Sequence, residues 1–410
     1  MSQSHNRPLI IVILGALSTI SPFAIDMYLP AFPEMARSLD TTTARISLSL
    51  SSYFAGFAAA QLIYGPLLDR FGRKKPLYIG LILFVLASMA CLLARNVEWL
   101  VGWRFVQALG GCAAAVSAMA MVRDFFPARE TAKIISLLIL VLSASPLLAP
   151  SIGVFVAVHL GWQWVFIVLS AFVLVMLVVS AWVLPEGYEP DHSIRLRPLP
   201  ILRNYATVLQ EPQFLTYALA TAFAFSGLLV YVASSPIVFM EVFHVTAREF
   251  GAIFACLATG FVGSNQVNIL LLRKFSSDRI FRGAMFVVCP VATLLLAGTV
   301  CGWFGLWQTL VLLFITLSAL GLSAPNGSAL ALVPFDHNIG SASAMLGFLQ
   351  IGVSGLASAC IGVFDSHTLM PVALVLAVTS WIGLAILLLG RHRLPQLRFV
   401  EEKDAHQLPH

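Results

Sequence analysis

Charge is scarce in this sequence. Asp, Glu, Lys and Arg together make up only 10% of the 410 residues, whereas hydrophobic residues make up 59%. The mean hydropathy of +0.91 is far above that of soluble proteins, whose surfaces need much more charge than this. The composition therefore excludes an ordinary soluble protein and predicts an all-α polytopic membrane protein.

The groups needed for enzymatic or metal chemistry are also missing. The six cysteines all lie in apolar runs, and none has a C-x-x-C or other metal-binding spacing, so we interpret them as reduced packing residues. The sequence contains no nucleotide-binding P-loop motif, no metal-ligand cluster and no plausible pair of nucleophile and base. We therefore expect no enzymatic activity, no cofactor and no metal.

A concentrated basic patch is absent too. The formal net charge is +5, which by itself is compatible with nucleic-acid binding. The Lys and Arg residues, however, are scattered over short segments between apolar runs instead of being gathered on one face. Membrane orientation explains this distribution better than nucleic-acid binding does.

Long apolar runs are what the sequence contains in abundance. One crossing of the hydrocarbon core requires about 20 apolar residues, and the sequence has twelve such runs. They cover residues 9–29, 46–68, 76–95, 98–121, 133–158, 163–184, 214–240, 250–272, 283–302, 307–332, 340–364 and 371–390. The first run is long, contains Asp26 and lacks a small-x-small cleavage site, so we interpret it as a helix and not as a signal peptide. The sequence thus predicts twelve transmembrane helices.

The basic residues outside these runs predict the orientation. With the N-terminus in the cytoplasm, the outer side receives Arg37, Arg45, Arg95 and Arg248, and every other Lys and Arg except Arg104 falls on the inner side. Cytoplasmic segments of membrane proteins carry an excess of Lys and Arg. We therefore expect both chain ends in the cytoplasm.

The longest polar interruption divides the chain into two sets of six runs. It covers residues 185–213 and is rich in proline and charge. We expect an N-terminal six-helix half at residues 1–184, a cytoplasmic linker at 185–213, a C-terminal six-helix half at 214–390 and a cytoplasmic tail at 391–410.

A charged segment, residues 65–75, links the second and third runs. Its sequence is G-P-L-L-D-R-F-G-R-K-K, in which five of eleven residues are charged. Its two glycines would let the backbone turn sharply, and an ordinary positive-inside loop is the alternative interpretation. The segment resembles the G-x-L-x-D-R-x-G-R-K signature of major facilitator superfamily transporters, which have two six-helix halves. The resemblance makes five residues candidates for a conformational gate: Gly65, Asp69, Arg70, Gly72 and Arg73.

We expect Asp69 to act as a conformational latch and not as a proton carrier. Residues 334–339 before the eleventh run contain no Lys or Arg, so its partner would be the amino end of helix 11 near Gly340 and Ser341. Exposed N–H groups and the helix dipole favour a negative charge there by about 0.3–1 kcal/mol. The neighbouring arginines would hold the carboxylate in place, and the latch would form only when the halves close on the cytoplasmic side. The alternative is that Asp69 merely caps the turn.

Two ionisable residues, Asp26 and Arg104, lie well inside apolar runs. Each would cost about 2.5–3.5 kcal/mol if it lay alone near the centre of a spanning helix. A helical rise of about 1.5 Å per residue places both in the outer half of the bilayer at a similar depth. They could therefore face one another.

Asp26 is the candidate proton carrier, because none of the nine histidines lies deep in a predicted helix. Burial favours the protonated form of a carboxyl group, and a nearby guanidinium favours the ionised form. A substrate that changes either influence would change the protonation of Asp26, which is the physical basis of proton-coupled antiport. The alternative is that Asp26 marks a helix end leading into Pro30, where its carboxylate reaches interfacial water.

Arg104 begins the sequence R-F-V-Q-A, residues 104–108, which resembles the R-x-x-Q-G motif of helix 4 in the superfamily. Ala108 replaces the usual glycine, and this small residue still permits close packing. We assign Arg104 to proton coupling together with Asp26; the alternative is that its head group snorkels to solvent. At the end of the same run, Asp124 is expected to anchor the helix at the inner interface.

The fifth run contains the sequence S-A-S-P-L-L-A-P-S-I-G, residues 143–153. It resembles motif C of drug antiporters, with Ala149 where that motif commonly has glycine. Pro146 and Pro150 would bend the helix, and Gly153 would let a neighbouring helix pack closely. The motif is associated with exporters more than with importers, whereas the alternative is merely a bent helix.

Polar residues in otherwise apolar helices are candidates for lining a substrate cavity. They are Tyr53, Gln61, Gln107, Asn265 and Asn326. Such groups either form hydrogen bonds between helices or line a wet cavity, and the sequence leaves both possibilities open.

Together with I-D-M-Y-L-P-A at residues 25–31 and A-P-N-G at residues 324–327, these motifs resemble the Bcr/CflA drug resistance transporters over essentially the whole chain. The resemblance implies a bacterial inner-membrane protein that exports small hydrophobic or amphipathic drugs against protons by alternating access. Chloramphenicol or florfenicol, bicyclomycin and sulfonamides are associated with its members. The expected partners are a small-molecule drug, protons and the lipid bilayer, and we expect a monomer.

Two other functions compete with drug export. The first is export of one endogenous metabolite, such as a siderophore or a nucleoside, by the same machinery. The second is an importer or a transport-inactive sensor. Motif C and Asp26 favour export over import, and a sensor would have no soluble domain with which to signal.

Overall fold

The computed structural model describes residues 7–186, 190, 198–335, 338–364, 368–392 and 394. All regular secondary structure within these residues is helical. Twelve helical segments among them are long and apolar enough to cross a membrane, which confirms the predicted fold class. A helix satisfies its backbone hydrogen bonds internally, as a hydrocarbon environment requires of a spanning segment.

The spans correspond closely to the predicted runs, and short helices extend two of them. The elements are α1 (Arg7–Asp26), η1 (Leu29–Ala31), α2 (Phe32–Ser38), α3 (Thr43–Phe71), α4 (Lys74–Leu92), α5 (Val97–Phe125), α6 (Ala128–Leu160), α7 (Gln163–Val183), α8 (Pro198–Leu209), α9 (Pro212–Pro236), η2 (Ile237–Val242), α10 (Ala247–Leu271), α11 (Ser277–Val300), α12 (Leu306–Leu332), α13 (Ile339–Phe364) and α14 (Met370–His392).

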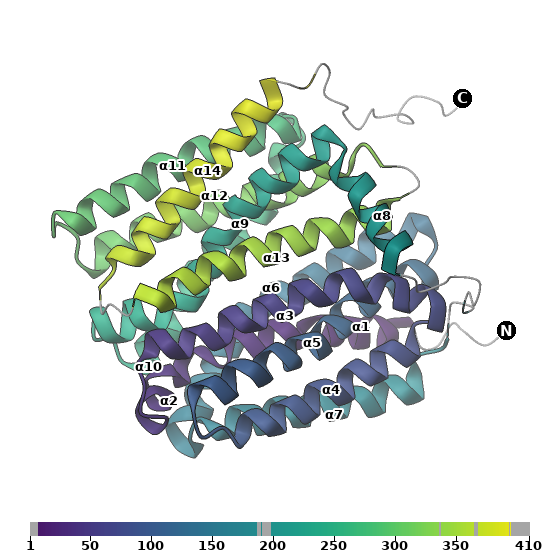
Figure 1. The fold of residues 1–410 in the computed structure, drawn as a ribbon, viewed down its shortest axis with the longest axis horizontal. Helices are drawn as coiled ribbons and strands as arrows, with labels where there is room; N and C mark the ends of the chain where they lie inside the picture. Colours follow the sequence, from purple (N-terminus) through teal and green to yellow (C-terminus); the bar gives the residue numbers. More distant parts are fainter. Residues whose placement is uncertain are drawn as a thin grey trace.

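The spanning helices form two groups of six. The first group contains α1 and α3 to α7, and the second contains α9 to α14. Figure 1 shows α1, α3, α4 and α5, in purple and blue, below α11 to α14, in green and yellow. The two halves meet chiefly where α3 packs along α13 and where α6 packs against α10.

The charged segment after the second span is less of a turn than the sequence suggested. Helix α3 continues through Pro66 to Phe71, so Gly65 lies inside a helix and the prediction of a turn there was wrong. Gly72 does turn the chain, with a φ of +78° that glycine adopts without strain. A glycine permits a turn without imposing one, and once a helix is formed each further residue extends it easily.

The linker contains an amphipathic helix, α8, that was not predicted. Its residues Tyr205 and Val208 are buried, whereas Leu199 is 77% exposed. The signal was present in the sequence, because Ile201, Tyr205 and Val208 recur at the helical spacing of four and three residues. The high proline and charge content of the whole linker obscured it.

Candidate functional site

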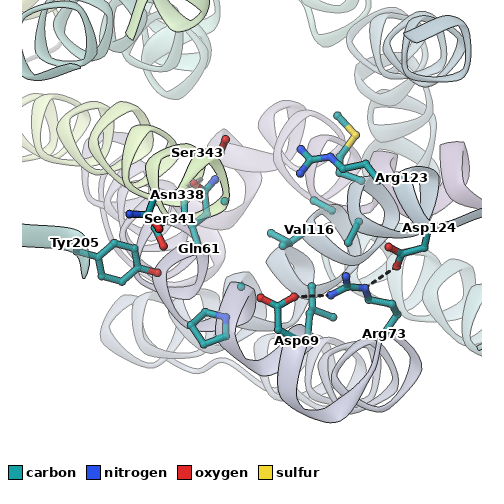
Figure 2. A pocket seen from close by; sticks show the side chains of 18 of the residues that line it. Gln61, Asp69, Arg73, Val116, Arg123, Asp124, Tyr205, Asn338, Ser341 and Ser343 are labelled. Atoms are coloured by element: carbon teal, nitrogen blue, oxygen red, sulfur yellow. Dashed lines mark hydrogen bonds and ion pairs between the residues drawn. The ribbon is translucent and has the colours of Figure 1, made fainter. Parts of the chain in front are cut away.

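A cavity of about 660 Å³ lies between the two halves, at the end of the bundle where α3 stops. We call this the Asp69 end, and the opposite end the Asp26 end. Figure 2 shows the cavity between α3 and α5 of the first half and the beginning of α13 of the second. Its polar lining consists of Gln61, Asp69, Arg73, Arg123, Asp124, Tyr205, Asn338, Ser341 and Ser343, and its larger apolar side chains include Phe57, Val116 and Met119.

The linker helix α8 contributes Tyr205 to this cavity. The Tyr205 hydroxyl donates a hydrogen bond of 2.8 Å to the carbonyl oxygen of Leu62 in α3. Helix α8 also packs against α13, so the linker touches both halves at the Asp69 end. Burial raises the pKa of the Tyr205 phenol, which therefore remains a neutral donor at physiological pH.

Arg73 ties the wall of the cavity together. Its Nε donates to Asp124 Oδ2 at 2.7 Å and its Nη1 donates to Asp69 Oδ1 at 2.9 Å, both drawn in Figure 2. Its backbone N–H donates to Glu186 Oε1 at 2.8 Å. Burial lowers the pKa of Arg73 and the two aspartates raise it by more, so the net shift is upward and the guanidinium stays charged. Asp124 thus anchors the end of α5, as predicted.

The proposed latch partner of Asp69 lies across the cavity. Gly340 and Ser341, at the beginning of α13, line the same cavity as Asp69, whose carboxylate pairs with Arg73. Arg70, which was also expected to hold Asp69, has its guanidinium 5.4 Å from the centre of the Phe71 ring instead. The halves are apart at this end, so the latch remains a prediction for the state in which they close.

Arg104 lies in a fully buried cluster within the first half. Its exposed fraction is 0%, and its guanidinium carbon lies 4.5 Å from the centre of the Tyr28 ring and 4.4 Å from that of Tyr53. Nη2 donates to the carbonyl oxygen of Ala24 at 3.0 Å, and Nη1 donates to Gln107 Oε1. Two aromatic faces and two oxygens together compensate a cation that water does not reach, so the snorkelling alternative is wrong for Arg104.

Asp26 is the last residue of α1 and is 6% exposed. Tyr231 of α9, in the other half, lies within electrostatic range of its carboxylate. The Tyr231 hydroxyl is buried without a hydrogen-bond partner among the described residues. Asp26 itself forms no ion pair with any residue that the structure describes. The carboxylate therefore lies at the contact between the halves, and the alternative in which it reaches interfacial water is not what the structure shows.

The expectation that Asp26 and Arg104 face one another is not met. The predicted depth was right, because Arg104 reaches the carbonyl of Ala24, only two residues before Asp26. The surroundings of the two side chains nevertheless differ. Arg104 is enclosed by groups of the first half, whereas Asp26 lies just before η1, which packs against α9 and α10 of the other half. Arg104 holds the end of the helix that carries Asp26, rather than the carboxylate itself.

Gly153 of the motif-C segment packs against the chain just after Asp26. A Cβ added to Gly153 would overlap the carbonyl oxygen of Met27, so only glycine lets α6 approach this closely. Pro150, one turn earlier in α6, is buried, and Pro146 is partly buried. The structure thus brings the motifs of the first, fourth and fifth spans together at residues 24–27.

Of the candidate cavity residues in the first half, one lines the cavity and two are buried away from it. Gln61 lines the cavity at the Asp69 end. Tyr53 and Gln107 are fully buried around Arg104, with the Tyr53 hydroxyl donating to Ser21 Oγ at 3.0 Å and Gln107 Nε2 donating to Ser88 Oγ at 2.6 Å. The interpretation of these two as cavity residues is therefore wrong for this conformation, since their hydrogen bonds join helices within the first half.

The two candidates of the second half also form internal hydrogen bonds. Asn326 is 2% exposed, and its Nδ2 donates to Asn268 Oδ1 at 2.6 Å, which joins α12 to α10. Asn265 Nδ2 donates to the carbonyl oxygen of Phe261 in its own helix at 3.1 Å. Polar side chains in this position act as contacts between and within helices, so Asn326 is a structural residue here.

The halves are closed at the Asp26 end by α3 and α13. Glycines of α13 allow the close approach: a Cβ added at Gly355 would lie 3.2 Å from an α3 side chain, and one added at Gly362 would overlap Leu48. The hydroxyls of Ser51 and Ser358 are hydrogen-bonded at 2.9 Å across the contact. The bundle is thus closed at one end and hollow at the other.

A second buried carboxylate, Asp278 at the start of α11, was missed by the sequence analysis. It is 3% exposed and pairs with Arg282 at 3.0 Å and Arg391 at 2.8 Å. The Tyr217 hydroxyl also donates to it, at 2.8 Å. The surrounding segment faintly repeats the charged segment at residues 65–75, which was the signal available. Fully compensated charges of this kind hold α9, α11 and α14 together at the Asp69 end.

Comparison with known proteins shows which family and which relatives this chain is similar to. The family description "Major Facilitator Superfamily" matches residues 14–359. The chain is 30% identical to an MFS-type transporter, YdgK, of Bacillus subtilis, over 94% of this chain and 96% of that protein. It is 27% identical to a bicyclomycin resistance protein homolog of Haemophilus influenzae, over 90% and 93% of the two chains. It is 29% identical to the multidrug resistance protein MdtL of Escherichia coli, over 92% and 95%.

Solved structures show the same fold. The crystal structure of a D-xylose-proton symporter superposes with a TM-score of 0.75 at 14% identity, covering 95% of this chain and 99% of the symporter. A bacterial homolog of the human lysosomal transporter Spinster, in an inward-facing and occupied conformation, superposes with a TM-score of 0.74 at 15% identity, covering 98% and 100%. The relatives and the fold agree with the resemblance found in the motifs. The chain is a multi-pass membrane transporter and belongs to the major facilitator superfamily.

Proposed function

We propose that the protein is a proton-coupled efflux transporter for small hydrophobic or amphipathic compounds, of the type of chloramphenicol or florfenicol, bicyclomycin and sulfonamides. The observation that carries this proposal is the position of Asp26. It is a buried carboxylate at the contact between the halves, and no ion pair neutralises it within the described residues. Ionisable groups inside membrane spans are costly and mark proton or substrate pathways. The relatives named for bicyclomycin and multidrug resistance support a drug as the cargo.

Arg104 acts in this proposal as a positioning residue for α1. Its hydrogen bond to Ala24 fixes the helix end that carries Asp26, while Gly153 lets α6 rest on Met27. A proton gained or lost at Asp26 changes the charge at a point where α1, α6 and α9 meet. The protonation state is thereby able to bias how the two halves sit against one another.

The proposed orientation places the Asp69 end in the cytoplasm of a bacterium, with the protein in the inner membrane and both chain ends inside. The concentration of Lys and Arg at this end supports that orientation. We keep the proposed division into halves at residues 1–184 and 214–390, joined by a cytoplasmic linker at 185–213 that includes α8, with a tail at 391–410. Of this tail, residues 391–392 belong to α14, and residues 393 and 395–410 lie outside the described part of the chain, as do linker residues 187–189 and 191–197. The monomeric state is also part of the proposal.

In this orientation the structure corresponds to an inward-open state. Cargo would enter the cavity from the cytoplasm, between α3, α5 and α13. Closure at the Asp69 end would then accompany separation of α3 from α13 at the Asp26 end, as alternating access requires.

The test is substrate-induced proton movement in everted membrane vesicles. Asp26→Asn keeps the shape of the side chain but cannot titrate, so we expect normal insertion and loss of coupled proton movement. Glu98→Gln is the matched control, because Glu98 is an exposed carboxylate paired with Arg45 at 2.9 Å. Wild-type coupling in Asp26→Asn vesicles would exclude Asp26 as the proton carrier.

Export of one endogenous metabolite, such as a siderophore or a nucleoside, is the second candidate function. A growth-inhibition panel in a pump-deficient host, with and without this gene, separates the two. Resistance to several unrelated compounds supports drug export. Resistance to none of them, with accumulation of a metabolite outside the cell, supports metabolite export.

A further inference from the structure

A second cavity lies outside the cavity shared by the halves, on the surface of the second half. It is a groove of about 490 Å³ between the end of α10, the first half of α11 and the middle of α12. Its lining is apolar apart from Arg279 and Ser318, and includes Phe275, Val287 and Phe314, which are 46%, 44% and 39% exposed. From Arg279 to Val287 the groove extends along α11 for about 12 Å at the helical rise of about 1.5 Å per residue.

A missing side chain hollows this groove. Gly283 of α11 lines the groove, and a Cβ added there would meet nothing within 4 Å. The groove therefore has open space directly beside the Gly283 backbone. Because α10, α11 and α12 are all spanning helices, the groove opens towards hydrocarbon, and an apolar chain is the ligand that fits it.

The charge at one end of the groove is positive. Arg279 lines the groove at the Asp69 end, and Arg273 and Lys274 follow Leu271, the last groove residue of α10, within three residues. All three basic residues are exposed. The nearby carboxylate of Asp278 is buried and already paired with Arg282 and Arg391, so it does not neutralise them.

We propose that this groove binds an anionic phospholipid. One acyl chain lies in the apolar groove over Gly283, and the phosphate headgroup lies at the interface beside Arg279, Arg273 and Lys274. The apolar groove matches the acyl chain of such a molecule. The basic side chains at its end, which Asp278 does not neutralise, match the phosphate. Basic clusters at the ends of spanning helices recognise anionic headgroups in this way.

The experiment is native mass spectrometry of the purified full-length protein with phosphatidylglycerol and, separately, with phosphatidylcholine of the same chain length. We expect phosphatidylglycerol to bind more tightly. Replacing Arg273, Lys274 and Arg279 by Gln should remove this preference, with about a fivefold loss of affinity for each charge. Gly283→Leu should fill the groove and reduce binding of both lipids while leaving all charges in place.

Two matched variants control these changes. Arg248→Gln removes an exposed charge at the opposite end of α10, and Gly102→Leu adds a side chain at another exposed glycine with nothing within 4 Å. Both should bind like the wild type. Glycerol phosphate, which has the headgroup charge without the acyl chain, should not compete; effective competition would show a free-phosphate site and overturn the proposal. Equal binding of the two lipids, or wild-type binding of phosphatidylglycerol to Gly283→Leu, would overturn it as well.

Discussion

The hydroxyl of Tyr205 takes the place of the amide proton that Pro66 lacks. In a continuous helix the carbonyl of Leu62 would accept from the N–H of residue 66, but proline has no N–H. The Tyr205 hydroxyl donates to this same carbonyl at 2.8 Å. The linker helix is therefore fastened to α3 at a backbone acceptor inside the helix that Pro66 leaves free, beside the cavity.

We predict that Tyr205→Phe destabilises the protein by about 0.5–1.5 kcal/mol, the usual contribution of one hydrogen bond. In a Pro66→Ala background the amide proton is restored, so the same substitution should cost clearly less. The measurement is the free energy of unfolding in mixed micelles for the wild type, both single variants and the double variant. An equal cost of Tyr205→Phe in both backgrounds would show that Tyr205 does not compensate for Pro66.

We predict that Arg104→Ala abolishes transport and that Arg104→Lys retains only part of it. A guanidinium can lie between the two tyrosine rings and reach both the Ala24 carbonyl and Gln107, whereas an ammonium cannot reproduce this planar arrangement. The measurement is drug efflux from energised cells at equal protein levels. Full activity of Arg104→Lys would show that only the charge matters.

The same geometry predicts how substitutions of Asp26 and Arg104 together affect the stability of the protein. Because Arg104 holds the Ala24 carbonyl and not the carboxylate, the stability changes of Asp26→Asn and Arg104→Lys should add within about 0.3–0.5 kcal/mol. The check is the free energy of unfolding of the two single variants and the double variant. A large non-additive term would indicate a direct ion pair.

We predict that Gly153→Ala impairs transport and destabilises the protein by about 1–3 kcal/mol, the range for overpacking. The added methyl group would overlap the Met27 carbonyl and push α6 away from the segment after Asp26. Gly65→Ala is the control in stability measurements, since a Cβ at Gly65 meets nothing within 4 Å. Similar stability of the two variants would show that α6 can move without cost.

We predict that Asp69→Asn shifts the protein towards the inward-open state. The carboxylate would be lost as a ligand for the amino end of α13 when the Asp69 end closes, although its present partner is Arg73. The readout is labelling of Ser341→Cys by a membrane-impermeant reagent in everted vesicles, since Ser341 lines the open cavity. Labelling should increase in the variant; unchanged labelling with normal efflux would leave Asp69 only the role of holding Arg73.

The spans and the depth of Asp26 and Arg104 could be predicted because both depend on position along the chain. Apolar length determines a span, and a constant rise per residue determines depth. The direction of a side chain depends instead on helix rotation, which changes by about 100° per residue. The rotation of the fourth span decides whether Arg104 faces Asp26 or, as observed, Tyr28 and Tyr53. Apolar helices with small hydrophobic asymmetry offer little in the sequence from which to predict that rotation.

Other features escaped prediction because their partners are remote in sequence. Asp278 and Arg391 are more than a hundred residues apart in the sequence, and Tyr205 and Leu62 are 143 residues apart. Neither contact leaves a local pattern. The charged segment at residues 65–75 showed the opposite error. Its two glycines suggested two turning points, but α3 persists through Gly65 to Phe71, because a glycine permits a turn without requiring one.

Helix α13 contains no charged residue, and it forms the contact with α3 at the Asp26 end through glycines and a pair of serines. The Asp69 end is lined by ionised groups. Dissolved salt screens charges over about 8 Å at physiological ionic strength, but it leaves packing between small uncharged residues unaffected. In the proposed orientation, the salinity of the growth medium therefore has little effect on the α3–α13 contact that faces it, whereas the ionic strength of the cytoplasm screens the charges that line the cavity at the Asp69 end.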